Sequence, residues 1–76
     1  MSPPLPTVTA RQVARAAEKP GFRFDRQRGS HAVYIRSSDG QRIVIPMHKG
    51  RDIRARLLPS FISDMGITRD EFQGLL

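Results

Sequence analysis

The spacing of hydrophobic residues changes twice along this chain, and this change limits the fold more than any other feature. Residues 10–19 carry apolar side chains at helical spacing, whereas three short runs, at 22–26, 31–36 and 42–45, alternate with a period of two. Helical spacing returns at 58–66. The pattern predicts an α+β domain of order α-β-β-β-α, with a three-stranded antiparallel sheet and a short C-terminal helix.

Capping residues mark the ends of the predicted helices. Thr9 has Gln12 three residues after it, and Thr68 has Glu71 at the same distance, which is the spacing of a capping box. A Pro-Gly pair stops the first helix, because proline cannot continue the hydrogen-bond ladder. Pro59 fits only the first turn of the second helix. We interpret the segment between the third strand and that helix, residues 47–56, as a basic loop.

The second predicted strand, residues 31–36, has two distinct faces. We expect Val33 and Ile35 to face the core. A regular strand would place His31 on that same face, so an accessible His31 requires that the strand begins after it or that the sheet ends there. Glycine-containing turns at 28–30 and 38–40 join this strand to its neighbours. The opposite face would carry Ala32, Tyr34 and Arg36.

The chain of 76 residues has room for one domain. Residues 1–6 contain three prolines and no periodic pattern, so we interpret residues 1–8 as a flexible leader and residues 9–76 as the domain. Without cysteine, the small core has no disulfides and the chain has no thiolate metal site. No apolar stretch approaches the roughly 20 residues that span a bilayer, so we expect a soluble, cytoplasmic protein.

The net charge of +6 is concentrated in the middle of the sequence. Residues 23–56 contain nine cations and three acids, while the flanking segments are balanced. A polyanion such as RNA is the natural partner for such a segment, although a solvated face or an acidic protein partner would use the same charges. Arginine dominates, and its planar fork pairs with phosphate through two hydrogen bonds and stacks on bases.

Two histidines, His31 and His48, are the main candidates for chemistry. Histidine exchanges protons near neutral pH, and attack of a ribose 2′-hydroxyl on its own phosphodiester needs a base, an acid and cations. Two histidines without a cysteine or carboxylate cluster do not predict a metal or other cofactor. Ser30 is a hydrogen-bond donor to phosphate or backbone rather than a nucleophile. Tyr34 either stacks on a base or makes a cross-strand contact.

Four segments, in this order, resemble a known family. Residues 26–31 (Arg-Gln-Arg-Gly-Ser-His), 39–40 (Asp-Gly), 45–48 (Ile-Pro-Met-His) and 66–68 (Gly-Ile-Thr) resemble the HicA toxins of bacterial and archaeal toxin–antitoxin modules over roughly residues 9–76. The Gly-Ser-His element after a basic run is the most specific of these matches.

The resemblance implies a fold similar to the double-stranded RNA-binding domain and an mRNA-cleaving activity that stops translation. It implies neutralisation by a HicB-type antitoxin and a role in stress response. The histidine of the Gly-Ser-His element, which the family requires for toxicity, falls on His31. His48 matches the histidine after the strand-ending proline, where it would contact RNA or transfer a proton.

The sequence therefore leads to one principal hypothesis and two alternatives. The principal one is an endoribonuclease, an mRNA interferase, that acts on single-stranded or messenger RNA with His31 as general acid or base. The first alternative is a non-catalytic RNA-binding module that blocks translation by occupancy, and the second is a basic face that docks an acidic protein. The expected RNA contacts are Arg26, Arg28, Lys49, Arg51, Arg36 and Tyr34, with Ser30 and His48 as further candidates.

Overall fold

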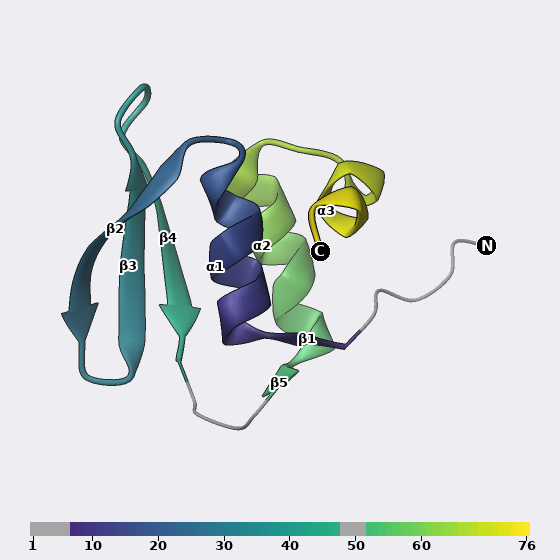
Figure 1. Ribbon diagram of the computed structural model, residues 1–76, viewed down its shortest axis with the longest axis horizontal. Coiled ribbons are helices and arrows are strands. Elements are labelled where there is room, and N and C mark those ends of the chain that lie inside the picture. The colour runs from purple at the N-terminus through teal and green to yellow at the C-terminus, as the bar shows by residue number, and fades with distance from the viewer. Residues whose placement is uncertain (1–6, 48–51) are drawn as a thin grey trace.

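A three-stranded sheet and two helices that pack on one of its faces form the centre of the molecule (Figure 1). The computed structural model describes residues 7–47 and 52–76. The elements are β1 (Val8–Thr9), α1 (Ala10–Glu18), β2 (Phe22–Arg28), β3 (His31–Arg36), β4 (Gln41–Pro46), β5 (Asp52–Ile53), a 3-10 turn (Ala55–Leu57), α2 (Leu58–Met65) and α3 (Arg69–Leu75). This is the α+β order expected from the sequence, and it is consistent with a fold like the double-stranded RNA-binding domain.

The sheet is an antiparallel meander of order β2-β3-β4. The β2–β3 hairpin turns through Gly29 and Ser30, and Gly29 has a φ of 59°, a backbone conformation that favours glycine. The β3–β4 hairpin turns through residues 37–40, where the amide of Gly40 donates to the carbonyl of Arg36 at 2.8 Å. Both turns lie where the glycines predicted them.

The predicted helix ends are confirmed. Thr9 and Gln12 form a reciprocal capping box at the start of α1, and Thr68 and Glu71 form another at the start of α3. In each box the threonine hydroxyl accepts from a backbone amide and the partner side chain accepts from the threonine amide. Pro59 lies in the first turn of α2, where its missing N–H costs nothing.

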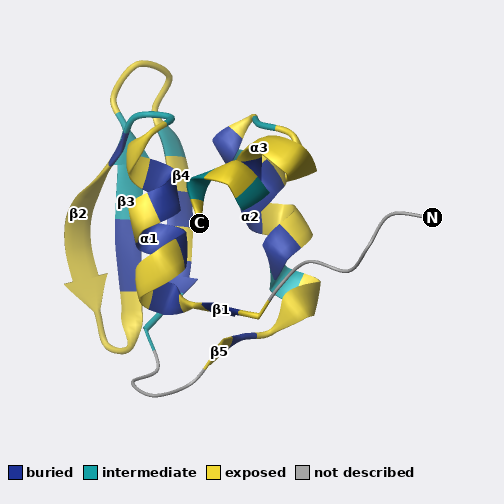
Figure 2. Ribbon diagram, turned by 45° about the vertical axis from the view of Figure 1, so that its right-hand side comes forward, coloured by how far each residue is buried: buried dark blue, intermediate teal, exposed yellow. Residues whose placement is uncertain are grey.

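The core lies between the helices and what we call the inner face of the sheet (Figure 2). Phe22, Ile43 and Ile45 on this face are fully buried against apolar residues of α1 and α2. The strand register places Ala32 opposite Ile45, so Ala32 also belongs to the inner face.

The expected orientation of the second strand was wrong. Since successive side chains of a strand alternate, the inner face receives Ala32, Tyr34 and Arg36, while Val33 and Ile35 lie on the opposite, outer face. Val33 is nevertheless buried; it lies on the middle strand, with Arg26 and Val44 opposite it on the two neighbouring strands. The alternation itself was identified correctly, but the covered face was assigned to the wrong set of residues.

Two short strands that the sequence did not predict hold residues 8–9 against the segment before α2. Val8 and Thr9 of β1 pair antiparallel with Ile53 and Asp52 of β5. Val8 is buried, so the packed part of the chain begins before Thr9, within the stretch interpreted as leader. The expected loop at 47–56 is therefore wrong for the part that the structure describes, since β5 and a 3-10 turn lie within it.

Candidate nucleic-acid interface and catalytic residue

The outer face of the sheet carries His31 at one end. The register aligns three rows of residues across β2, β3 and β4 on this face. His31, the first residue of β3, is exposed, and Arg28 and Pro46 lie directly opposite it on the two neighbouring strands. From this end toward the β3–β4 turn, the rows are Arg28–His31–Pro46, Arg26–Val33–Val44 and Arg23–Ile35–Arg42.

The sheet ends at His31, as one of the two conditions considered from the sequence required, but the orientation of the strand is what makes His31 accessible. It is a regular member of β3 and shares a face with Val33 and Ile35, but that face is the outer one. The helices cover the other side of the sheet. Correcting the orientation of the strand thus removes the conflict between His31 and the core.

A β-bulge in β2 determines which arginines share the face of His31. The pairing between β2 and β3 shifts between Phe24 and Arg26, leaving Asp25 as an extra residue. Strict alternation from Phe22 would have turned Arg26 and Arg28 toward the inner face. After the bulge they pair with Val33 and His31 on the outer face. Sequence reasoning missed the bulge, although two arginines in phase with a buried phenylalanine are a signal that alternation is interrupted.

The arginines of β2 differ in how far protein groups already engage them. Arg23 donates through Nη1 to the carbonyls of Glu18 and Phe22, at 3.1 and 2.9 Å. Arg26 forms an ion pair with the carboxylate of Asp25, in which both side chains are exposed. Arg28 is exposed and its side chain has no partner among the described residues. The arginine nearest to His31 is therefore the one most available to an anion.

Two predicted RNA contacts, Tyr34 and Arg36, lie on the inner face, away from His31. Tyr34 is half-buried and makes an edge contact with Phe24, with ring centroids 5.8 Å apart. Burial and, to a lesser degree, the negative charge of Glu18 raise the pKa of Tyr34. Of the two interpretations of Tyr34, the structure therefore supports the cross-strand contact.

Arg36 holds parts of the fold together. Its guanidinium lies over the ring of Phe22, 4.7 Å from the centroid, and Nη1 donates to the carbonyls of Pro20 and Met65. Nε and Nη2 donate to the carboxylate of Asp39 at 3.0 and 2.8 Å. These hydrogen bonds, with one from the amide of Gln41, lower the pKa of Asp39 to about 2. Arg36 therefore joins the end of α1, the end of α2 and the β3–β4 turn.

Ser30 lies in the exposed turn beside His31, and its carbonyl accepts from the amide of Met47 at 2.6 Å. This bond ties the end of β4 to the turn before His31. The remaining candidates, His48, Lys49 and Arg51, lie outside the described residues. In the described ranges, no group of three or more His, Cys, Asp or Glu side chains could hold a metal ion.

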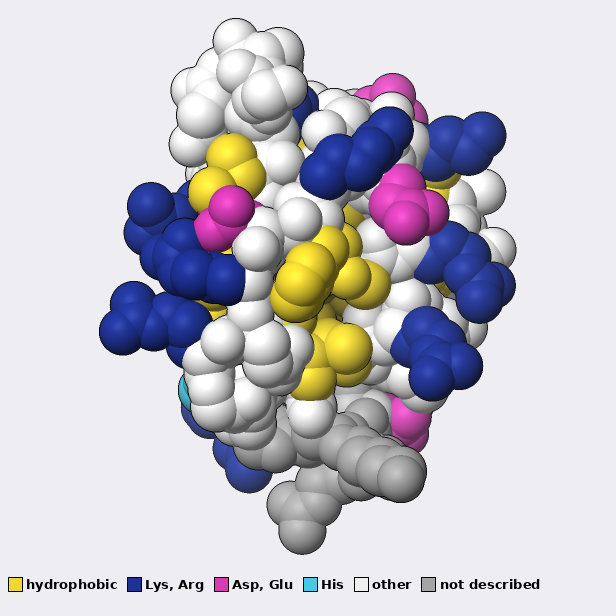
Figure 3. Space-filling model, turned by 60° about the vertical axis from the view of Figure 1, so that its left-hand side comes forward, with side chains coloured by type: hydrophobic (Ala, Val, Ile, Leu, Met, Phe, Trp, Pro, Cys, Tyr) yellow, Lys and Arg dark blue, Asp and Glu magenta, His cyan; other side chains and the backbone are white. Residues whose placement is uncertain are grey.

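Hydrophobic and basic side chains also gather on the side of the molecule that β2 borders. Figure 3 shows a hydrophobic band there, with Lys and Arg side chains on both sides of it. Phe24, which is 56% exposed, projects from the inner face at this edge of the sheet. It lies on the face opposite to that of His31.

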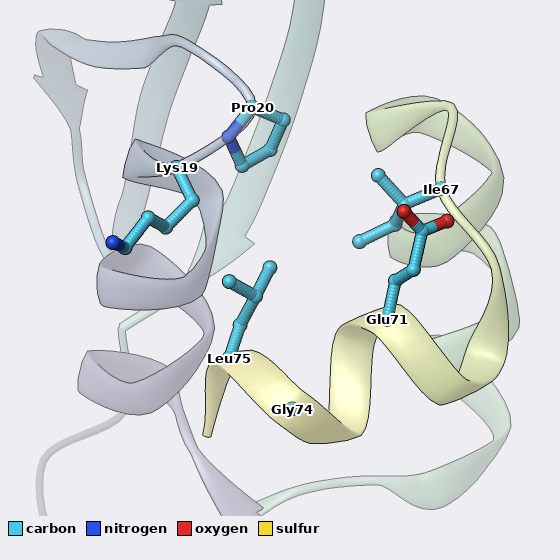
Figure 4. Close-up of a pocket in the computed structure, with 6 residues that line it drawn as sticks. All are labelled: Lys19, Pro20, Ile67, Glu71, Gly74 and Leu75. Carbon is cyan, nitrogen blue, oxygen red and sulfur yellow. The ribbon is translucent and has the colours of Figure 1, made fainter.

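A pocket between the end of α1 and α3 is separate from the outer face (Figure 4). Its charged side chains are Lys19 and Glu71, and the Glu71 carboxylate already accepts from the amide of Thr68 in the capping box. The walls of Pro20, Ile67 and Leu75 are apolar. The pocket brings together none of the residues expected to act on RNA.

Comparison with known proteins decides the family. The model of the HicA toxin of bacterial toxin–antitoxin systems matches residues 10–67, which is more than half of the chain. The chain belongs to the HicA toxin family. The match covers α1, the whole three-stranded sheet and α2, and therefore includes His31. A search of curated protein sequences finds no match.

Membership of the HicA family makes this protein the toxin component of a toxin–antitoxin system, and it implies an antitoxin as partner. None of the helices in residues 7–47 and 52–76 has the length and apolar character needed to cross a membrane. The matched region ends before α3, so α3, with its buried Phe72, extends the chain beyond it.

Proposed function

We propose that this HicA toxin is an endoribonuclease, an mRNA interferase, in which His31 acts as general acid or general base on a phosphodiester. The observation that carries the proposal is the exposed His31 on a face where Arg28 stands directly opposite it. A cation beside a proton-exchanging side chain is what cleavage through a ribose 2′-hydroxyl requires.

The reaction involves two proton transfers, one from the attacking 2′-hydroxyl and one to the leaving 5′-oxygen. The 2′-oxygen attacks phosphorus and loses its proton to a base, and the bond from phosphorus to the 5′-oxygen breaks as that oxygen takes a proton from an acid. The products are a 2′,3′-cyclic phosphate and a 5′-hydroxyl. His31 supplies one of these transfers, and Arg28 stabilises the negative charge that grows on the phosphoryl oxygens.

The remaining candidates have supporting roles in the proposal. Arg26, Lys49 and Arg51 contribute phosphate contacts, Ser30 donates a hydrogen bond to phosphate from the turn, and His48 is a candidate for the second proton transfer. Tyr34 and Arg36 are left out, because their positions on the inner face give them structural partners. A HicB-type antitoxin that covers this basic face would inhibit the toxin.

The test compares His31→Ala with the unmodified protein on a synthetic RNA. We expect cleavage to fall by about 10²- to 10⁴-fold, the usual contribution of a general acid or base, while the circular dichroism spectrum stays unchanged. RNA with a 2′-deoxyribose at the cleavage position should stay intact. Arg15→Ala, an exposed substitution on α1, is the control and should cleave normally.

Two results would contradict this function. If His31→Ala cleaves RNA and arrests growth as well as the unmodified toxin, His31 has no role in the chemistry. If the unmodified toxin arrests growth and retards RNA but leaves it intact, the protein blocks translation by occupancy, which is the non-catalytic alternative.

A further inference from the structure

The row next to His31 on the outer face has an unusual composition. Arg26, Val33 and Val44 lie side by side across the three strands, one row away from Arg28, His31 and Pro46. Adjacent rows on one face of a strand are about 6.6 Å apart, and adjacent strands about 4.8 Å apart. Val44 is 44% exposed, and with the half-buried Ile35 and Pro46 it forms an apolar strip beside the buried Val33.

The charge on this face has one sign. None of the nine residues in the three rows is acidic, and arginines stand at both margins, from β2 on one side and as Arg42 from β4 on the other. Asp25 lies in the bulge of β2 and is paired with Arg26. An apolar strip beside a margin of arginines on β2, with Arg42 at one end of β4, fits a polyanion that carries flat apolar groups, and a nucleic-acid strand has both properties.

We propose that the outer face binds an extended single strand of RNA, with a base adjacent to the reacting phosphate resting on Val44. The proposal rests on the function proposed above only in that His31 marks the reacting phosphate. Arg28 and Arg26 contact consecutive phosphates along β2. The flanking base then reaches across β3 toward Val44, a span of two strand spacings, or about 9.6 Å.

The substrate is single-stranded because a duplex keeps its bases stacked and paired, so no base face is free to rest on Val44. The sheet is also narrow, with three strands covering about 10 Å. The valine contact supplies affinity without hydrogen bonds to base edges, and it therefore tolerates different sequences. Val44 is a positioning residue, since it seats the base and leaves the proton transfers to other groups.

An exposed valine on an edge strand also has a simple explanation, because β-branched residues favour strands and single apolar residues are common on surfaces. The experiment must therefore measure RNA binding and not only stability. Val44→Asp places a negative charge on the strip, and Val44→Thr keeps the shape and strand preference while adding a hydroxyl. Leu76→Asp is the matched control, because Leu76 is 41% exposed and lies at the end of the chain.

The probe is a short fluorescent RNA of mixed sequence with 2′-O-methyl groups, which the toxin cannot cleave through the 2′-hydroxyl. We expect Val44→Asp to raise Kd by about tenfold or more and Val44→Thr to raise it by a smaller factor, in line with the loss of one base contact. Leu76→Asp should bind as the unmodified protein does. Unlabelled duplex of the same sequence should compete at least about tenfold less well than the single strand.

An RNA probe that lacks one base tests whether that base binds at Val44. In the unmodified protein, removing the base next to the reacting phosphate should weaken binding, and in Val44→Asp the same removal should have little further effect, because the two changes delete one contact. Equal binding by all variants, or equal competition by duplex, would overturn the proposal. Loss of antitoxin binding without loss of RNA binding would also overturn it, by assigning the face to the protein partner.

The two proposals fail separately. The binding measurement uses RNA that cannot be cut. It therefore tests whether a base binds at Val44 even if His31→Ala shows that the toxin has another catalytic group. Conversely, unaffected binding in Val44→Asp together with lost cleavage in His31→Ala would leave the ribonuclease intact and remove only the base seat.

Discussion

The inner and outer faces of the same sheet use arginine in opposite ways. On the inner face, Arg36 stacks on Phe22 and donates hydrogen bonds to three different parts of the chain. On the outer face, Arg28 is exposed and has no side-chain partner among the described residues. The number of arginines in the sequence therefore overstates the binding surface, and the face on which each one lies decides its role.

The two faces also differ in what they contribute to stability. The inner face buries Phe22, Ile43 and Ile45 completely in the one hydrophobic cluster of the described core. The outer face buries Val33 but leaves Val44 and the arginines of β2 exposed. Substitutions on the inner face should thus be read as changes in folding, and those on the outer face as changes in binding.

The largest change in stability should follow from a substitution on the inner face. Phe22→Ala should lower the free energy of unfolding by about 3–5 kcal/mol, because it leaves a cavity at a fully buried position. Ile35→Ala, on the outer face and half-buried, should cost about 1 kcal/mol or less. Urea denaturation followed by circular dichroism measures both, with the slope m as a check that unfolding stays two-state.

A small domain has only about 4–11 kcal/mol of stability in total, so Phe22→Ala should remove from about a quarter to all of it. If Ile35→Ala proves as damaging as Phe22→Ala, the two faces do not differ in the way described, and the orientation expected from the sequence would regain support.

Most of the fold was predictable because its signals are local. The capping boxes at Thr9 and Thr68 involve side chains three residues apart, and glycines mark both hairpin turns. Neither depends on how the elements pack. The α-β-β-β-α order follows from these signals and from the change of hydrophobic period.

The orientation of β3 was not predictable in the same way. Alternation divides its residues into two sets but does not tell which set the helices cover. The sequence favoured Val33 and Ile35 as core because they are larger and more apolar than Ala32. The structure instead places Ala32 opposite Ile45 under the helices. Long-range packing made this choice, and no signal within the strand reports it.

The candidate site was predictable in part. His31 stood out from its residue type, and its exposure agrees with a chemical role. The alignment of Arg26 and Arg28 with His31 was not foreseen, because it depends on the extra residue Asp25 in the bulge. The two-residue strands β1 and β5 are too short to show any alternation, so only tertiary structure reveals their pairing.

On the outer face, a substitution of Arg28 should have a smaller effect, which is on RNA binding. Arg28→Gln should weaken RNA binding several-fold and make the slope of log K against log salt less negative by about one, because one phosphate contact and its released counterion are lost. Arg15→Gln removes the same charge from α1, on the other side of the sheet, and should leave the slope nearly unchanged. Fluorescence anisotropy titrations at several salt concentrations measure both variants.

Equal changes in slope for Arg28→Gln and Arg15→Gln would show that RNA responds to the net charge of the protein and not to the outer face. If only Arg15→Gln made the slope of log K against log salt less negative, the RNA-binding surface would lie on α1.

The smallest effect concerns the inner-face arginine. Asp39 has a pKa lowered to about 2 by its hydrogen bonds with Arg36 and with the amide of Gln41. Its carboxylate therefore stabilises the folded state fully above its ordinary pKa of 3.8, and this stabilisation is lost as the pH falls toward 2. Asp39→Asn should lower Tm slightly at neutral pH, and the difference from the unmodified protein should shrink as the pH falls through this range.

The partner of the carboxylate is tested by a double-mutant cycle. If the ion pair with Arg36 is the main cause, Asp39→Asn should have a much smaller effect in an Arg36→Gln background than in the unmodified protein, because the first substitution has already removed the contact. Thermal melts at a series of pH values supply all four corners of the cycle. A full effect of Asp39→Asn in both backgrounds would mean that Asp39 acts through the turn at Gln41, and Arg36 would then be held by Phe22 and the two carbonyls alone.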